Sequence, residues 1–262
     1  MKEKLKQFLK KLLSKRTFKI RFGIVEGLKI QGISLYAFGF LKKALTREEQ
    51  FIKQLDLREK IVFDIGAYIG IFSMFFAKAV GPKGHVYIYE PNPINLDKVK
   101  NNLQINGFEN AAMYPIALGA KKDTANLAFR GRGTATGSLQ ENIKSDILNE
   151  ANSTVIEVEI DTLDNQISIN DLPKPDFVKI DVEGLELDVL NGMQETLKLH
   201  KPDLYIEIHG SSTSEKIKNA KSVVDFLIGY GYLIYHVESE QSIATDNASE
   251  ATEGHLWCQV KS

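Results

Sequence analysis

Hydrophobic residues in the first half of the chain fall in short runs that are separated by longer segments with a helical spacing of apolar positions. In chain order the pattern predicts a strand at 61–65, a helix at 70–80, a strand at 85–90, a helix at 95–106 that Gly107 closes, and a strand at 111–118. Alternating strands and helices of this length predict a parallel sheet with right-handed crossovers.

The same alternation returns in the second half of the chain after an interruption at 120–160. The interruption contains two short strand patterns, at 126–129 and 154–160, and predicts an antiparallel excursion whose glycine-rich tip, 130–138, is either a substrate loop or a plain hairpin tip. After it the pattern predicts a strand at 177–182, a helix at 186–193, a strand at 204–209, a helix at 214–230, a strand at 232–237, a loop at 238–254 with five acids and no Lys or Arg, and a strand at 255–260. We expect the last strand to pair antiparallel at or near the edge of the sheet.

The first 57 residues form a preliminary region before the regular pattern, so we expect a division into 1–57 and a main domain at 58–262. Residues 1–22 carry nine Lys or Arg and one acid together with a helical stripe of apolar residues. Such a basic amphipathic helix lies on an anionic membrane surface, holds a partner, or packs its stripe on the domain. We further expect a hairpin within 24–35 and a helix from a capping box at Thr46 to about Leu55.

Composition narrows the possible partners. The 262 residues carry a formal net charge of −1, so the chain lacks the basic field of a general nucleic-acid binder, and we expect no nucleic-acid partner. No apolar run reaches the ~20 residues that span a bilayer, and we expect no signal peptide. Cys258 is the single cysteine, which favours a reducing, cytoplasmic compartment, with membrane association at the surface as the alternative that residues 1–22 leave open. The oligomeric state stays open.

The turn after the first predicted strand indicates a nucleotide-like ligand. It reads Asp64-Ile65-Gly66-Ala67-Tyr68-Ile69-Gly70. Gly66 suits a sharp turn and lets a ligand approach without a Cβ in the way, and Gly70 suits the start of a closely packed helix. It is neither a P-loop nor a Gly-x-Gly-x-x-Gly turn, and its acid favours a ligand with a cationic end such as S-adenosylmethionine. Glu90, which ends the next strand before Pro91 and Asn92, is placed to accept both ribose hydroxyls.

Seven segments between Val62 and His209 resemble the FkbM family of methyltransferases. They are Val62–Gly70, Tyr89-Glu90-Pro91-Asn92-Pro93, Asn101–Gly107, Ala117-Leu118-Gly119, Thr162-Leu163-Asp164, Val178-Lys179-Ile180-Asp181-Val182-Glu183-Gly184 and Pro202–His209. The resemblance implies a class I, Rossmann-like α/β fold with a mostly parallel seven-stranded sheet whose last strand is antiparallel. It also implies O-methylation of a hydroxyl on a sugar, glycan, glycolipid-like acceptor or secondary metabolite, with S-adenosylmethionine as the cofactor.

The predicted cofactor site combines this resemblance with the two strand-end motifs. Its residues are Asp64, Gly66, Ala67, Tyr68, Gly70, Glu90, Pro91, Asn92 and Ala117. Tyr68 departs from the resemblance because the family usually has Asn there, so the contacts of residue 68 stay open.

The carboxyl ends of two later strands supply the predicted catalytic residues, which are Lys179, Asp181, Glu183 and His209. Alternate residues of a strand face one way, so Asp181 should meet Glu207 and His209 of the neighbouring strand. These three could hold Mg²⁺, or Asp181 or His209 could act as a general base without metal. Two structural roles are the alternatives: Lys179 as an ion-pair partner of Asp181 or Glu207, and Glu183 as a cap of the following helix.

Two other functions share the same sequence features. A nicotinamide-dependent oxidoreductase would use the same sheet and the same Glu90, and a non-catalytic module would bind adenosine without turning over a substrate. An RNA methyltransferase has support only in the basic residues 1–22.

Overall fold

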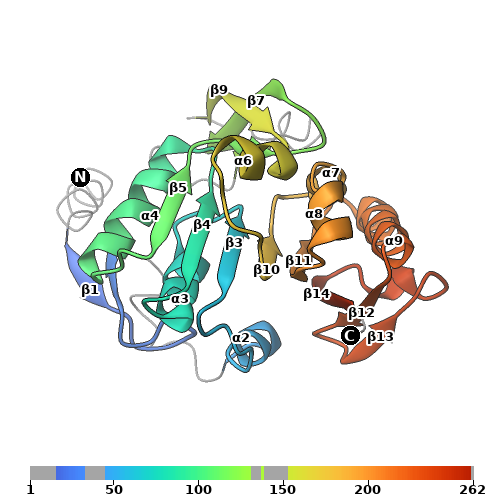
Figure 1. Ribbon diagram of the computed structural model, residues 1–262, viewed down its shortest axis with the longest axis horizontal. Helices are drawn as coiled ribbons and strands as arrows, with labels where there is room; N and C mark the ends of the chain where they lie inside the picture. Colours follow the sequence, from blue (N-terminus) through green and yellow to red (C-terminus); the bar gives the residue numbers. More distant parts are fainter. Residues whose placement is uncertain (1–15, 33–44, 131–136, 139–152, 261–262) are drawn as a thin grey trace, which may run out of the picture.

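An eight-stranded sheet forms the centre of the computed structural model, which describes residues 16–32, 45–130, 137–138 and 153–260 (Figure 1). Its strand order is β13-β12-β14-β11-β10-β3-β4-β5. The strands are β3 (Ile61–Ile65), β4 (His85–Tyr89), β5 (Ala111–Tyr114), β10 (Phe177–Ile180), β11 (Asp203–Ile208), β12 (Tyr232–His236), β13 (Gln241–Ile243) and β14 (Gly254–Val260). The chain leaves β3 in one direction through β4 and β5, and later leaves β10 in the other through β11, so the order reverses between β3 and β10. Ligands of open parallel sheets bind at such a reversal.

Strand β14 runs antiparallel to both β11 and β12, as the sequence predicts. It lies inside the sheet rather than at the edge, because hydrogen bonds to strands on both sides satisfy its backbone. Seven of the eight strands match the predicted number. The eighth, β13, is a three-residue strand that pairs antiparallel with β12. The rest of the predicted loop 238–254 includes a 3-10 turn, Ala248–Glu250, that contacts helix α9 (Thr213–Gly229). The side chains of Ile243, Ala248 and Ala251 are buried in the core that α9 shares with the sheet.

Helices cover both faces of the sheet. On one face lie α7 (Glu186–Asn191), α8 (Gln194–Leu199) and α9 (Thr213–Gly229), whose apolar side chains share a core with β10 and β11. On the other lie α2 (Arg47–Ile52), α3 (Ile71–Val80) and α4 (Pro93–Ile105), with the N-terminal hairpin. That second core joins Ile20 and Ile30 to Val62 and Val86, so residues on both sides of the predicted boundary near residue 57 pack together.

The N-terminal hairpin differs from its prediction in position. Strand β1 (Thr17–Lys19) pairs antiparallel with β2 (Lys29–Gln31), so residues 17–19 are a strand and not part of a helix over 1–22. Backbone pairing with β2 is available to them because Gly27 turns the chain at a φ of 88°. The remainder of the predicted helix, residues 1–15, lies outside the described residues, and so does the question of membrane contact. No helix among the described residues is long and apolar enough to cross a membrane.

The capping box at Thr46 is confirmed, since its hydroxyl accepts the Glu49 N–H and the Glu49 carboxylate accepts the Thr46 N–H. Helix α2 ends at Ile52, three residues earlier than predicted.

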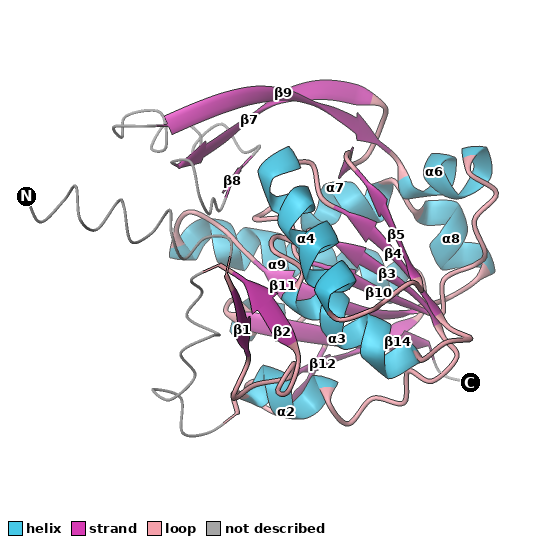
Figure 2. Cartoon of the chain, turned by 90° about the vertical axis from the view of Figure 1, so that its left-hand side faces the viewer, coloured by secondary structure: helices cyan, strands magenta, loops and turns pink. Residues whose placement is uncertain are grey.

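The interruption at 120–160 folds as a separate four-stranded sheet, in the order β6-β9-β7-β8. Its strands are β6 (Ala117–Leu118), β7 (Asp123–Arg130), β8 (Gly137–Ser138) and β9 (Ser153–Asp161). Figure 2 shows β7 and β9 as a long curved ribbon above one end of the main sheet. The predicted strand 111–118 is divided between the two sheets at Pro115, which has no N–H to continue a ladder. Most of the predicted loop 130–138 lies outside the described residues.

Two short helices were not predicted. Helix α6 (Leu163–Ile169) begins at Thr162, whose hydroxyl accepts the Asn165 N–H, and α8 follows α7 after a break at Gly192. A Cβ at Gly192 would lie 2.0 Å from the carbonyl oxygen of Gly119, so this glycine lets the helical layer contact the start of the small sheet.

Candidate active site

A cavity of about 320 Å³ opens at the carboxyl ends of β3, β4, β10 and β11, where the strand order reverses. It is large enough for part of a nucleotide ligand and an acceptor group. Of the residues predicted from the sequence, those that line it are Gly66, Tyr68, Glu90, Pro91, Asn92, Ala117, Asp181, Glu183, Glu207 and His209. Those that do not line it are Asp64, Ala67, Gly70 and Lys179.

The turn between β3 and α3 is built by residues in left-handed backbone conformations. Gly66 has a φ of 79°, and a Cβ there would lie 1.7 Å from the carbonyl oxygen of Asp181. Its missing side chain therefore makes room for the Asp181 carbonyl, directly after β10. Gly66 also lines the cavity, so the approach of a ligand to it stays a prediction. Gly70, with a φ of 82°, lets α3 begin beside Val99 of α4. Tyr68 adopts a φ of 52°, which is uncommon for a residue with a side chain.

Glu90 is the buried acid at the end of β4. Its Oε2 accepts the Tyr68 N–H at 2.8 Å, and its Oε1 accepts the Asn92 N–H at 2.9 Å. Burial raises the pKa of Glu90 to about 7, against the opposing effect of these hydrogen bonds. Asn95 also donates to Oε1, but at 3.4 Å, so a ligand hydroxyl can replace that long bond on Oε1 and another can use the open position on Oε2.

Beneath the cavity, Lys179 forms a buried charge cluster with two aspartates. Its Nζ lies 3.0 Å from Asp181 Oδ2 and 3.6 Å from Asp64 Oδ1, and it donates to the Gly66 carbonyl at 3.3 Å. Burial lowers the pKa of Lys179, but the charges of Asp181 and Asp64 outweigh that effect and raise it. The ion-pair alternative for Lys179 is thus what the structure shows. Asp64 is fully buried and accepts a hydrogen bond from the Ser73 hydroxyl at 2.5 Å. It does not contact the cavity, and Lys179 joins it to Asp181, which does.

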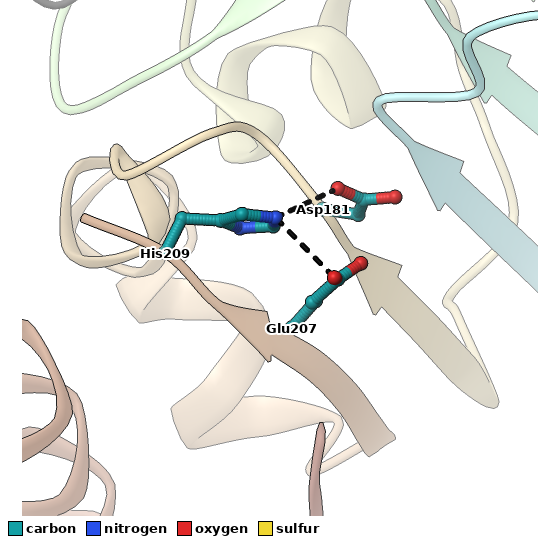
Figure 3. A group of neighbouring side chains, drawn as sticks. All are labelled: Asp181, Glu207 and His209. Atoms are coloured by element: carbon teal, nitrogen blue, oxygen red, sulfur yellow. Dashed lines mark ion pairs between the residues drawn. The ribbon is translucent and has the colours of Figure 1, made fainter. Parts of the chain in front are cut away.

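At the far end of the cavity, His209 faces three carboxylates. Its Nε2 lies 3.4 Å from Glu207 Oε1, 3.8 Å from Asp181 Oδ1 and 3.9 Å from Glu183 Oε2. Figure 3 shows the ring of His209 directed between Asp181, from the end of β10, and Glu207, from β11. The sequence prediction that these side chains meet is confirmed.

Glu186 fixes the orientation of that ring, and sequence reasoning missed it. This residue of α7 is fully buried, and its Oε1 lies 2.9 Å from His209 Nδ1. The same oxygen accepts the Gly184 N–H at 2.9 Å, and Asn219 donates to Oε2 at 2.6 Å. Burial lowers the pKa of His209, but hydrogen bonds with Glu186 and Glu207 outweigh it and raise that pKa to about 11. In the sequence, Glu186 stands out only as an acid three residues after Glu183, at the start of the predicted helix.

Glu183 does not cap the helix as the structural alternative supposed. Helix α7 has no side-chain cap, and it is Glu186 that accepts the neighbouring Gly184 N–H. Glu183 instead adopts a φ of 54° and lines the cavity. Burial raises its pKa, and the nearby charge of His209 opposes that change. Backbone strain of this kind is concentrated at functional sites.

The predicted metal ligands also lie together. Asp181, Glu207 and His209 each offer one ligand atom, and the three atoms lie within 4.8 Å of one another. Hard oxygen ligands with one imidazole suit Mg²⁺ and other divalent ions. Whether this cluster holds an ion stays a prediction.

Comparison with known proteins identifies the family. The model of the methyltransferase FkbM domain matches residues 64–234, well over half of the chain. The chain is 25% identical to the hexuronic acid methyltransferase AglP of Haloferax volcanii over 191 residues, which cover 68% of this chain and 74% of AglP. It is also 25% identical to part of the AMB antimetabolite synthetase AmbE of Pseudomonas aeruginosa, over 78% of this chain but only 10% of that much longer protein.

Among solved structures, the methyltransferase FkbM from Methylobacillus flagellatus KT superposes with a TM-score of 0.51 at 19% identity. The superposition covers 79% of this chain and 45% of that chain, and at this identity it supports the fold alone. The family match, together with the class I strand order and the cavity at its reversal point, leads to one assignment. The chain belongs to the FkbM family of S-adenosylmethionine-dependent methyltransferases.

Proposed function

We propose that this methyltransferase transfers the methyl group to a hydroxyl oxygen of a sugar or a similarly hydroxylated small molecule. The observation that carries the proposal is the group of three carboxylates that face His209 Nε2 at the ends of β10 and β11, on the other side of β3 from Glu90 at the end of β4. A hydroxyl is a poor nucleophile until its proton is removed, and these groups are placed to remove it.

The cofactor end of the cavity fits S-adenosylmethionine. Glu90 would accept the ribose hydroxyls, and Tyr68, Asn92 and Ala117 would border the adenosine, since all of them line the cavity. When bound, the cofactor supplies a methyl group on a positively charged sulfonium. The acidic residues that line the cavity favour a ligand of that charge over the pyrophosphate of a nicotinamide cofactor.

Within the cluster, Glu183 is the residue best suited to take the proton. The imidazoles of His209 and His255 beside Glu207 outweigh burial and lower the pKa of its carboxyl, so Glu207 is a weak base. Asp181 is held by the ammonium of Lys179. Glu183 lines the cavity, and burial raises its pKa, which strengthens it as a base.

The acceptor proposal draws on charge and on the relative AglP. AglP is named a hexuronic acid methyltransferase, which supports a sugar acceptor. Three carboxylates at the reacting end of the cavity would repel an anionic group, so we propose that the methylated position is a neutral hydroxyl. Leu127 of β7 also lines the cavity, so the small sheet contributes an apolar side chain to its wall.

The experiment is a methyl-transfer screen over neutral and acidic sugars, glycans and hydroxylated metabolites, with and without EDTA. Glu183→Gln should lower kcat about a hundredfold or more, the usual contribution of a general base, and leave the dissociation constant of S-adenosylmethionine unchanged. Glu159→Gln, which removes an exposed carboxylate of β9, is the matched control. Wild-type activity in Glu183→Gln would overturn the assignment of the base, and loss of activity in EDTA that Mg²⁺ restores would assign the cluster to a metal.

A further inference from the structure

A second histidine, His255, contacts the catalytic cluster from a strand that the family model does not include. His255 lies on β14 directly opposite Glu207 on β11 in the antiparallel register. Its Nε2 is 3.6 Å from Glu207 Oε2, while Glu207 Oε1 is 3.4 Å from His209 Nε2. Glu207 therefore lies between two imidazole rings, one oxygen facing each.

His255 is itself held on three sides. Its Nδ1 lies 2.7 Å from Glu238 Oε1, and its backbone N–H donates to Glu238 Oε2 at 2.7 Å. Its Nε2 lies 3.3 Å from Glu48 Oε1, a residue of α2. The ring stacks on Tyr205 with centroids 5.0 Å apart and an interplanar angle of 16°. A ring that is hydrogen-bonded at Nδ1, lies beside two carboxylates at Nε2 and is stacked on one face has little freedom to move.

The backbone of β14 leaves room for the carboxylate of Glu238 beside Gly254. A Cβ at Gly254 would lie 2.1 Å from Glu238 Oε2, so only glycine leaves room for this carboxylate beside the backbone of β14. His236 approaches the same oxygen at 3.5 Å, but both of its ring nitrogens are engaged elsewhere, by Ser239 and by the Glu253 carbonyl.

We propose that His255 is a positioning residue for methyl transfer: it holds Glu207 against His209, and Glu48 and Glu238 hold His255 in turn. All three of these supporting residues lie outside residues 64–234, the part that matches the FkbM family. Residues of α2, of β14 and of the turn after β12 therefore contact the group of carboxylates around His209 that the family motifs supply. This inference rests on the proposed function, because the step it supports is the deprotonation of an acceptor hydroxyl.

The test is a double-mutant cycle on kcat with His255→Gln and Glu207→Gln. If His255 acts through Glu207, each single variant lowers kcat about tenfold or more, and the double variant is no slower than Glu207→Gln alone. KM for S-adenosylmethionine stays at the wild-type value, since Glu90 is at the other end of the cavity. Glu238→Gln, a change at a partly exposed side chain, should lower kcat in the same direction and serves if His255→Gln folds poorly.

The matched control is His236→Gln, which removes another buried histidine of the same sheet that does not contact Glu207. It should lower the melting temperature to a similar extent and leave kcat within about twofold. The proposal would be overturned if the two losses of kcat multiplied in the double variant. It would also be overturned if His236→Gln lost as much kcat as His255→Gln.

A measurement that needs no acceptor separates this inference from the proposed function. The chain has five histidines, so their ring signals can be assigned in NMR spectra by substitution. His255→Gln should shift the ring signals of His209, and His236→Gln should leave them unchanged. Unchanged His209 signals in His255→Gln would overturn the inference even if methyl transfer to a hydroxyl is established. A shift without any methylated hydroxyl would leave the coupling in place and overturn the proposed function alone.

Discussion

Glu90 offers a quantitative test of the cofactor site, because its protonation and its proposed contact with ribose are linked. Burial raises the pKa of Glu90 to about 7. The ionised carboxylate accepts two ribose hydroxyls, whereas the protonated form loses one acceptor. The affinity for an adenosine ligand should therefore rise with pH through this range.

The size of the effect follows from the ionised fraction of Glu90. With a pKa of about 7, about 9% of the carboxyl is ionised at pH 6 and about 90% at pH 8. If the ionised form is the one that binds, the dissociation constant falls about tenfold between these pH values. Glu90→Gln should bind more weakly and show no such slope.

Calorimetric titration with 5′-methylthioadenosine measures this slope directly. That ligand keeps the adenine and the ribose but lacks the amino acid part, whose own ionisation near pH 8 would complicate the result. A flat pH profile for the wild-type chain, or the same slope in Glu90→Gln, would refute the reasoning.

The raised pKa of Glu90 also makes the free energy of unfolding depend on pH. The unfolded chain releases the Glu90 proton near its ordinary value of 4.5, and the folded chain holds it to about 7. The stability from this group is therefore fully present below pH 4.5 and is lost as pH rises through about 7. Through this group the free energy of unfolding falls by roughly 3 kcal/mol as the pH rises from below 4.5 to above 7. Glu90→Gln should remove this component from the pH dependence of unfolding by urea.

Three further predictions concern local structure and chemistry. Gly66→Ala should destabilise the fold by several kcal/mol, on the order of a severe core substitution, because its Cβ would overlap the Asp181 carbonyl; urea unfolding measures this, and a loss below about 1 kcal/mol would contradict it. Thr46→Ala should cost about 1 kcal/mol through loss of the capping box, and Thr46→Ser should restore most of it in the same assay. Glu186→Gln should lower kcat about tenfold with little change in cofactor affinity, since the His209 ring loses its charged partner; steady-state kinetics with unchanged kcat would argue against that role.

The sequence predicts the central strands and helices well because their patterns are local. The apolar run of β3 and the helical spacing of α3 need no information from elsewhere in the chain. Two elements could not be predicted from local patterns. Strand β13 exists through pairing with β12, and α8 forms where Gly192 meets the small sheet. Their stability comes from tertiary contacts that no local pattern records.

The candidate site likewise contains residues that the local pattern predicts and residues that only tertiary contacts bring together. Asp181, Glu207 and His209 could be placed together from alternation along two parallel strands. Glu186 and His255 could not, because their contacts depend on how α7 sits over β11 and on the register of β14. Gly66 was placed correctly in the turn, but what it makes room for, the backbone of β10, is visible only in three dimensions.

The most direct test of the account is methyl transfer from S-adenosylmethionine that carries a ¹³C-labelled methyl group, with a panel of neutral and acidic sugars as acceptors. The account predicts a labelled methyl ether on a hydroxyl oxygen, formed by the wild-type chain and by Glu159→Gln and reduced about a hundredfold or more in Glu183→Gln. Label that appears on a nitrogen, a carbon or a carboxylate, or turnover that does not depend on Glu183, would contradict it.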